Sequence, residues 1–283
     1  MHQPLLDALL AMACYGLGDF IYKRVAAAAV RSDHFLMTQA WFFCPIVILY
    51  ALATHRLVPV PAALWGSLAG LFAFIGFYYF SRSLAHGAVS TNASIFRMNF
   101  IVTVFLVIVL LGEPLTAGKI AGLALALLAT WLLLGAGADR TAGHEQRRSF
   151  VEVGVATLAF GASNFFHTVG LRHGALPETL AVAQAALFMP LATLVVYVAD
   201  RKLRPPPATF KYAIAAAIVL LAATILLLRG VAAGQASVVV PIAQMGFIVA
   251  ALLGIFVLRE QVTLRKSIGL VSALAALAVL AAS

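Results

Sequence analysis

Two opposite charges within long apolar segments are the residues of this 283-residue sequence with the clearest potential for chemistry. Asp19 lies in the first apolar segment and Arg97 in the fourth, each roughly eight residues from a loop on the same predicted side. A helix rises ~1.5 Å per residue, so both charges should lie ~12 Å from that side. Ionisable groups are costly inside a membrane and usually pair or line a pathway. We therefore expect an Asp19–Arg97 pair, which either belongs to a transport site or fixes helix packing.

The segment that contains Arg97 carries a polar face. Ser90, Ser94 and Arg97 share one stripe at helical spacing, and Asn92 and Asn99 lie on the adjoining stripe. A polar face on a spanning helix must point into protein or into a wet cavity. We therefore expect this face to line a central site.

Other polar residues are candidates with a structural alternative. His167 is either a structural histidine or a proton carrier, and Gln39 and Gln184 either line a cavity or bond between helices. Tyr78 and Tyr79, in an aromatic run, either form cavity walls or serve packing and interface anchoring. The candidate substrate-binding residues are Asp19, Lys23, Gln39, Tyr78, Tyr79, Asn92, Arg97, Asn99, Asn164, His167, Gln184 and Gln244.

The sequence shows none of the motifs of an enzyme or an ATPase. It has no nucleotide loop of the form GxxxxGK[ST], no cluster of His and Glu for a metal, and no Ser/His pairing at catalytic spacing. Cys14 and Cys44 lie inside apolar segments, where a cysteine most often fills space. We therefore expect no cofactor, no bound metal and no catalytic activity.

The elements that position these side chains are spanning helices. The chain is 63% hydrophobic and 10% charged, whereas a soluble domain carries about a quarter charged residues. The N-terminus lacks the basic region of a secretory signal, so we treat the first segment as a mature helix. Segments of ~20 apolar residues can span a bilayer. They fall at about 5–27, 33–53, 64–85, 89–111, 117–134, 151–171, 178–199, 210–232, 236–258 and 266–282.

The chain contains an internal duplication. Residues 82–123 match residues 229–270 without a gap at an offset of 147, with 17 of the 42 positions identical, and the front of each half matches at an offset of 145. Five helices per half is an odd number, so the second half must enter the bilayer from the opposite face. The predicted fold is an all-α integral membrane protein of ten transmembrane helices in two inverted five-helix repeats. The repeats are 1–138 and 150–283, with a linker at 139–149.

The two halves differ in charge. Asn164 stands where the first half has Asp19, and Gln244 stands where it has Arg97. The second half has lost both charges and kept polar groups, as an unsymmetrical substrate site would require.

A short motif closes the fourth helix of each half. LGEPLT at 111–116 recurs as LREQVT at 258–263. An acid, a capping threonine and a base at a helix hairpin are typical of a structural staple. The residues of this motif are Glu113, Thr116, Lys119, Glu260, Thr263 and Lys266.

Basic residues are concentrated on one side of the predicted membrane. The loops after the odd-numbered helices carry 14 of them and the other loops carry four. The positive-inside rule then puts the richer side in the cytoplasm and both termini outside. The net charge of +9 indicates attraction to anionic lipid and not to nucleic acid.

Ten spanning segments in two halves, with a GEPLT box after the fourth, resemble the EamA type of the drug/metabolite transporter superfamily over nearly the whole chain. The second box departs from the pattern, with Gln261 in place of Pro114. The resemblance implies a central cavity lined chiefly by the first, third, fourth, sixth, eighth and ninth helices. In this sequence that cavity would expose Asp19, Tyr78, Arg97, Asn164 and Gln244.

We therefore expect a multi-pass transporter of the bacterial inner membrane that exports a small polar or amphipathic metabolite, such as an amino acid, by alternating access. Efflux of organic cations is the alternative within transport. A membrane scaffold or an intramembrane enzyme is the alternative from another class. Expected partners are the substrate, the bilayer and either protons or a counter-substrate, and the protein is expected to be a monomer or a homodimer.

Overall fold

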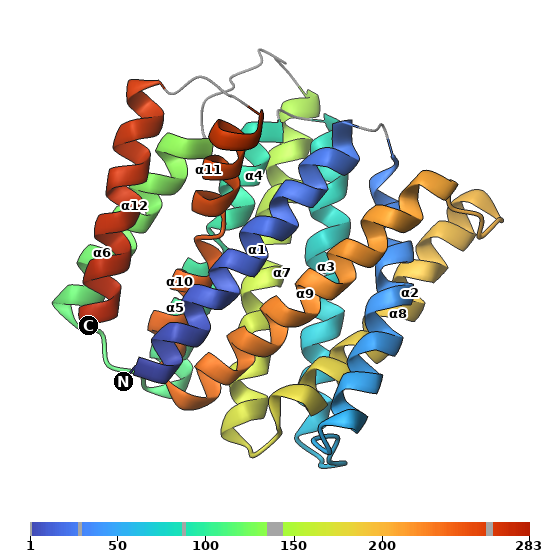
Figure 1. Cartoon of the computed structure of the whole chain (residues 1–283), viewed down its shortest axis with the longest axis horizontal. Helices are drawn as coiled ribbons and strands as arrows, with labels where there is room; N and C mark the ends of the chain where they lie inside the picture. The colour runs from blue at the N-terminus through green and yellow to red at the C-terminus, as the bar shows by residue number, and fades with distance from the viewer. Residues whose placement is uncertain (1, 28–29, 87–88, 135–143, 259–262) are drawn as a thin grey trace.

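A computed structural model describes residues 2–27, 30–86, 89–134, 144–258 and 263–283 (Figure 1). Within these residues all regular structure is helical, which confirms the predicted all-α class. The helices are α1 (His2–Ala27), α2 (Ser32–Ala53), α3 (Ala63–His86), α4 (Val89–Arg97), α5 (Asn99–Leu111), α6 (Ala117–Leu134), α7 (His144–Arg172), α8 (Pro177–Asp200), α9 (Pro207–Ala233), α10 (Ala236–Gln244), α11 (Phe247–Leu258) and α12 (Leu264–Ala282).

The predicted apolar segments are all present as helical stretches. Eight stretches in the described chain are long and apolar enough to cross a membrane, and two shorter apolar stretches, Ile95–Leu111 and Ala117–Leu133, complete the set. The ends of most helices agree with the predicted ends because the apolar run and the helix stop at the same polar residues.

Two helices predicted to be continuous are broken. The segment 89–111 divides into α4 and α5 at Met98, and the segment 236–258 divides into α10 and α11 after Gln244. At each break a methionine amide donates to the carbonyl three residues earlier, at 3.0 Å for Met98 and 3.1 Å for Met245. These tighter turns occur where another helix crosses closely, and close crossings are not visible in an apolar sequence pattern.

Glycines permit both crossings. A Cβ on Gly16 of α1 would lie 2.5 Å from the carbonyl oxygen of Gly246, between α10 and α11. A Cβ on Gly161 of α7 would lie 2.7 Å from the carbonyl oxygen of Asn99, at the start of α5. The two crossings use positions that correspond in the predicted repeats, because Gly161 follows Gly16 by 145 residues and Gly246 follows Asn99 by 147.

Helix α7 begins earlier than predicted. Residues 144–149, assigned from the sequence to a linker, are its first turns. Two of their polar side chains form contacts within the protein. Arg148 pairs with Glu152 at 3.2 Å, and the hydroxyl of Ser149 donates to the carbonyl of Ser83 at 3.0 Å. A polar stretch can therefore continue the helix beyond its apolar part.

The helices form one bundle in which long helices from the two predicted halves pack on each other (Figure 1). Helix α3 packs along α7 and α1 packs along α9, and these two pairs occupy corresponding positions in the predicted repeats. The pair α2–α8 lies at one edge of the bundle and the pair α6–α12 at the other. This packing supports the predicted repeats, whose boundaries stay a prediction.

Candidate functional site

Asp19 and Arg97 lie in contact. An Nη2 hydrogen of Arg97 is donated to Oδ1 of Asp19, across α1 and the end of α4. The two side chains retain 25% and 17% of their exposure, so the ion pair is mostly but not fully enclosed. The contact confirms the predicted pairing of Asp19 with Arg97, and the role of the pair in transport stays a prediction.

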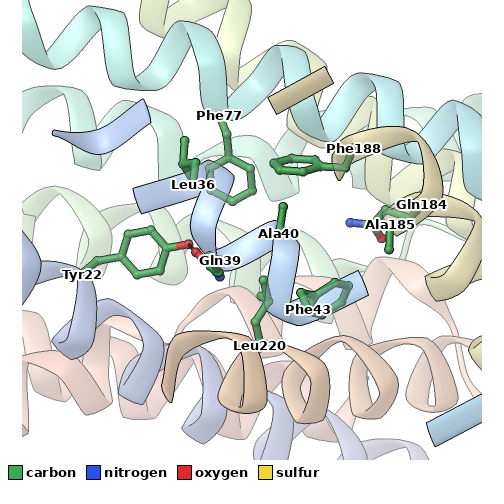
Figure 2. A pocket seen from close by; sticks show the side chains of 10 residues that line it. All are labelled: Tyr22, Leu36, Gln39, Ala40, Phe43, Phe77, Gln184, Ala185, Phe188 and Leu220. Atoms are coloured by element: carbon green, nitrogen blue, oxygen red, sulfur yellow. Dashed lines mark hydrogen bonds between the residues drawn. The ribbon is translucent and has the colours of Figure 1, made fainter. Parts of the chain in front are cut away.

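A pocket of ≈ 430 Å³, including its open part, lies between α2 and α8 and is closed by side chains of α1, α3 and α9. Figure 2 labels its ten lining residues; we call this cavity the central pocket. Three lining residues of α2 recur in α8 at the offset of 145. The pairs are Gln39 with Gln184, Ala40 with Ala185, and Phe43 with Phe188.

The central pocket is aromatic and apolar, with amides as its polar groups. The Tyr22 hydroxyl donates to Oε1 of Gln39 at 2.6 Å. On the opposite side, Oε1 of Gln184 is buried and has no hydrogen-bond partner among the described residues. Figure 2 shows the Gln184 amide nitrogen pointing toward Ala40, across the pocket from the Tyr22–Gln39 pair. The described lining contains no charged side chain, so the pocket itself is neutral.

The ion pair lies beside this pocket on α1. Tyr22 follows Asp19 by three residues, so the two side chains share one face of the helix. Arg97 binds Asp19 and Tyr22 lines the pocket, so the ion pair lies within one turn of α1 from the pocket wall. An uncharged pocket and a charge pair are therefore neighbours.

A second cavity of ≈ 330 Å³ adjoins the central pocket and shares Leu36, Phe77 and Phe188 with it. It reaches Asp33 at the start of α2 and Ser81 near the end of α3. We call it the vestibule; it is lined by Asp33, Leu36, Phe74, Phe77, Tyr78, Ser81, Phe188, Ala192 and Val195. The two cavities together lead from the space between α2 and α8 toward the side where α1 ends.

Several predicted site residues make structural contacts. The Asn92 amide donates to the Ser83 carbonyl at 2.7 Å and to the Ser149 hydroxyl at 2.8 Å, which ties α4 to α3 and α7. Asn99 donates to the Phe96 carbonyl at 2.8 Å, at the break between α4 and α5. Asn164 reaches Oδ1 of Asn99 at 3.4 Å.

The remaining candidates are distributed around the pocket. His167 and Gln244 are buried, and Nε2 of each has no hydrogen-bond partner among the described residues. Tyr78 lines the vestibule. The Tyr79 ring packs edge-on against the Tyr78 ring, with 5.4 Å between the ring centroids. The side chain of Lys23 lies outside the described residues.

The observed cavities differ from the expectation drawn from the family resemblance. Among the residues expected to be exposed, Tyr78 lines the vestibule, while Asp19, Arg97, Asn164 and Gln244 line neither described cavity. Most of the central pocket comes from α2 and α8, the second and seventh spanning segments, which the resemblance did not include. The repeated Gln and Phe positions of these helices were the sequence signal that could have identified them.

The GEPLT motif joins the two predicted halves. The Glu113 carboxylate accepts hydrogen bonds from the amides of Ala236, at 3.1 Å, and Ser237, at 2.9 Å, and so caps the start of α10. It also accepts from Arg172 at 3.0 Å. Lys119 donates to Oε1 of Gln235 at 2.5 Å.

The two threonines of the motif are helix caps. Thr116 accepts from the Lys119 amide at 3.2 Å, and Thr263 accepts from the Lys266 amide at 3.3 Å. Glu260 lies outside the described residues. These contacts are those of a structural staple.

Comparisons with known proteins bear on the fold and the family. Residues 4–135 match the model of the EamA-like transporter family. No curated protein matches the sequence. A solved structure described only as "Crystal structure of protein" has a TM-score of 0.82 and 17% sequence identity, over 98% of this chain and 95% of that one, so the likeness shows the fold alone. Residues 4–135, just under half of the chain, therefore belong to the EamA-like transporter family of the drug/metabolite transporter superfamily.

Proposed function

We propose that the protein is a secondary transporter that exports a small amphipathic metabolite, such as an amino acid, across the bacterial inner membrane. The observation that carries this proposal is the central pocket, which lies between two helices in corresponding repeat positions and continues into a vestibule. Inverted-repeat transporters place their substrate site between the repeats and rock the two halves around it. The vestibule lies on the side with more basic loops, which is the predicted cytoplasmic side and the side from which an exporter loads.

The lining of the central pocket favours a substrate with an apolar body and a polar group that can hydrogen-bond to an amide. The rings of Phe43, Phe77 and Phe188 supply apolar walls. The Gln184 amide, whose nitrogen points into the pocket, would donate a hydrogen bond to a carbonyl or hydroxyl group of the substrate. Buried polar groups left unpaired are costly, so a ligand that pairs with Gln184 gains relative to one that cannot.

The neighbouring ion pair favours a zwitterion over an organic cation. Asp19 is already neutralised by Arg97, so a cation would have to displace the guanidinium to reach the carboxylate. A zwitterion offers a carboxylate to Arg97 and an ammonium to Asp19 together, and thereby replaces both halves of the pair. Organic-cation efflux remains the second candidate because the aromatic walls also suit a cation.

Counterflow in proteoliposomes tests the proposal. We would load vesicles with one class of compound at a time (amino acids, nucleosides or quaternary ammonium compounds) and measure uptake of the labelled counterpart. Labelled amino acids should accumulate, and Gln184→Leu should lower the rate ~3- to 10-fold, as expected for one lost hydrogen bond. Gln146→Leu, the same change outside both cavities, is the matched control. Absence of flux for every class would favour a membrane scaffold.

A further inference from the structure

One end of α8 is held by a buried ion cluster. The Glu178 side chain is 0% exposed and accepts from Arg229 of α9 at 2.8 Å. Arg56, after the end of α2, lies 3.8 Å from the same carboxylate. The Tyr50 hydroxyl accepts from Arg229 at 2.8 Å. The start of α8 is therefore fastened to the end of α9 and to the end of α2.

The first half of the chain contains the same three charges at corresponding positions. Glu178 follows Asp33 by 145 residues, and Arg229 follows Arg82 by 147. Arg201, at the end of α8, follows Arg56 by 145. An acid and two arginines thus recur around the start of α2, the end of α3 and the end of α8.

In this structure the first-half charges are arranged differently. Asp33 pairs with Arg31 at 2.5 Å, and the start of α2 is held to the end of α8 by Asp200, which binds Arg31 at 2.9 Å and His34 at 2.5 Å. Arg82 pairs with Glu152 at 3.2 Å and donates to the Tyr78 hydroxyl at 3.2 Å. Glu178 and Arg229 bind each other in the second half, whereas Asp33 and Arg82 of the first half each bind another partner. Asp33 and Tyr78, the residue that Arg82 contacts, both line the vestibule.

The described positions that correspond to the vestibule lining are packed at the other end of the bundle. Seven of the nine positions that correspond to its lining belong to one packed apolar cluster, which includes Val47, Ile225 and Leu228. The other two, Glu178 and Thr224, are also buried. The same set of positions therefore encloses a cavity on one face and fills the space on the other.

We infer that Asp33, Arg82 and Arg201 form a second closing contact, made when the vestibule closes. Two inverted repeats can exchange their conformations, which converts a protein open on one face into one open on the other. In the exchanged state Asp33 binds Arg82 and Arg201 as Glu178 now binds Arg229 and Arg56. The Glu178 cluster opens at the same time. This inference rests on the proposed alternating-access function.

Thiol accessibility tests the inference without a substrate. In a background of Cys14→Ser and Cys44→Ala, Ser81→Cys reports the vestibule and Leu228→Cys reports the corresponding packed position. Both are labelled with a membrane-impermeant maleimide in lipid nanodiscs, which leave both faces accessible. Ser81→Cys should react and Leu228→Cys should be protected.

The informative variant is Arg229→Gln, which removes the main partner of Glu178. It shifts the population toward the exchanged state, so labelling of Leu228→Cys should rise and labelling of Ser81→Cys should fall, each about tenfold. Adding Asp33→Asn should restore the labelling of Ser81→Cys, because the vestibule then lacks its closing contact. Arg82→Gln should do the same.

Glu152→Gln is the matched control, because it removes the present partner of Arg82 and leaves Asp33 intact; it should not restore labelling. The inference is overturned if Leu228→Cys becomes reactive while Ser81→Cys is unchanged, since the faces then open independently. It is also overturned if Asp33→Asn does not restore the reactivity. Reciprocal labelling without counterflow would retain the contact and reject the transport proposal, and counterflow without reciprocal labelling would do the reverse.

Discussion

Neutralising Asp19 leaves the Arg97 guanidinium partly enclosed without its carboxylate. Breaking a fully buried pair in this way costs ~3–5 kcal/mol in soluble proteins. Here the two side chains retain 25% and 17% exposure, so we expect a smaller cost, ~2–3 kcal/mol, for Asp19→Asn. At ~2–4 °C per kcal/mol for a chain of this size, the midpoint of thermal unfolding should fall by ~4–12 °C.

The double variant Asp19→Asn with Arg97→Gln separates the structural role of the pair from its role in transport. It reproduces the neutral second half, where Asn164 and Gln244 occupy the corresponding positions. The parent's unfolding temperature should return, while counterflow should stay lost because both charges are missing from the site.

Thermal unfolding followed by intrinsic tryptophan fluorescence, with counterflow on the same preparations, measures both effects. If stability and transport return together, the pair is structural and the assignment of the site is wrong. If each single variant is as stable as the parent, the two side chains do not depend on each other, and the pairing argument fails.

Three further predictions concern the fold. A reporter that fluoresces only in the cytoplasm, fused after Ser283, should be dark because the basic loops put the C-terminus outside; a bright fusion would reverse the orientation. Glu113→Ala should lower the free energy of unfolding by ~2 kcal/mol through loss of two cap bonds, and Thr263→Ala, a single cap, by ~1 kcal/mol, as read from denaturation midpoints. Gly16→Ala should yield no folded protein in size-exclusion chromatography, because the new Cβ would lie 2.5 Å from the carbonyl oxygen of Gly246. Gly18→Ala should fold normally, because a Cβ there has no neighbour within 4 Å.

The spanning helices could be predicted because a bilayer imposes one simple requirement, a long apolar run, on each of them. The contact of Asp19 with Arg97 could be predicted for a similar reason, since depth follows from the number of residues to a loop. Both inferences use distance along a helix and need no knowledge of which helices are neighbours.

The helix breaks and the pocket depend on neighbours, and they could not be predicted in this way. Met98 lies between Arg97 and Asn99, neither of which breaks a helix by itself, and its tight turn occurs where α7 crosses at Gly161. Gln39 and Gln184 are separated by 145 residues, the offset of the front of the repeat, but only the packing of α2 on α8 shows that they face one cavity. Sequence periodicity indicates which face of a helix is polar, and it does not identify the helix opposite.

The cap that Glu113 provides has a consequence for how such a chain can arise. The carboxylate follows the fourth spanning segment and binds the start of α10 in the other half, and the same acid recurs in the sequence as Glu260. A contact of this kind does not require the two partners to be covalently joined. Two copies of a five-helix chain, inserted in opposite orientations, could each cap a helix of the other, so gene fusion would preserve a contact first made between separate subunits.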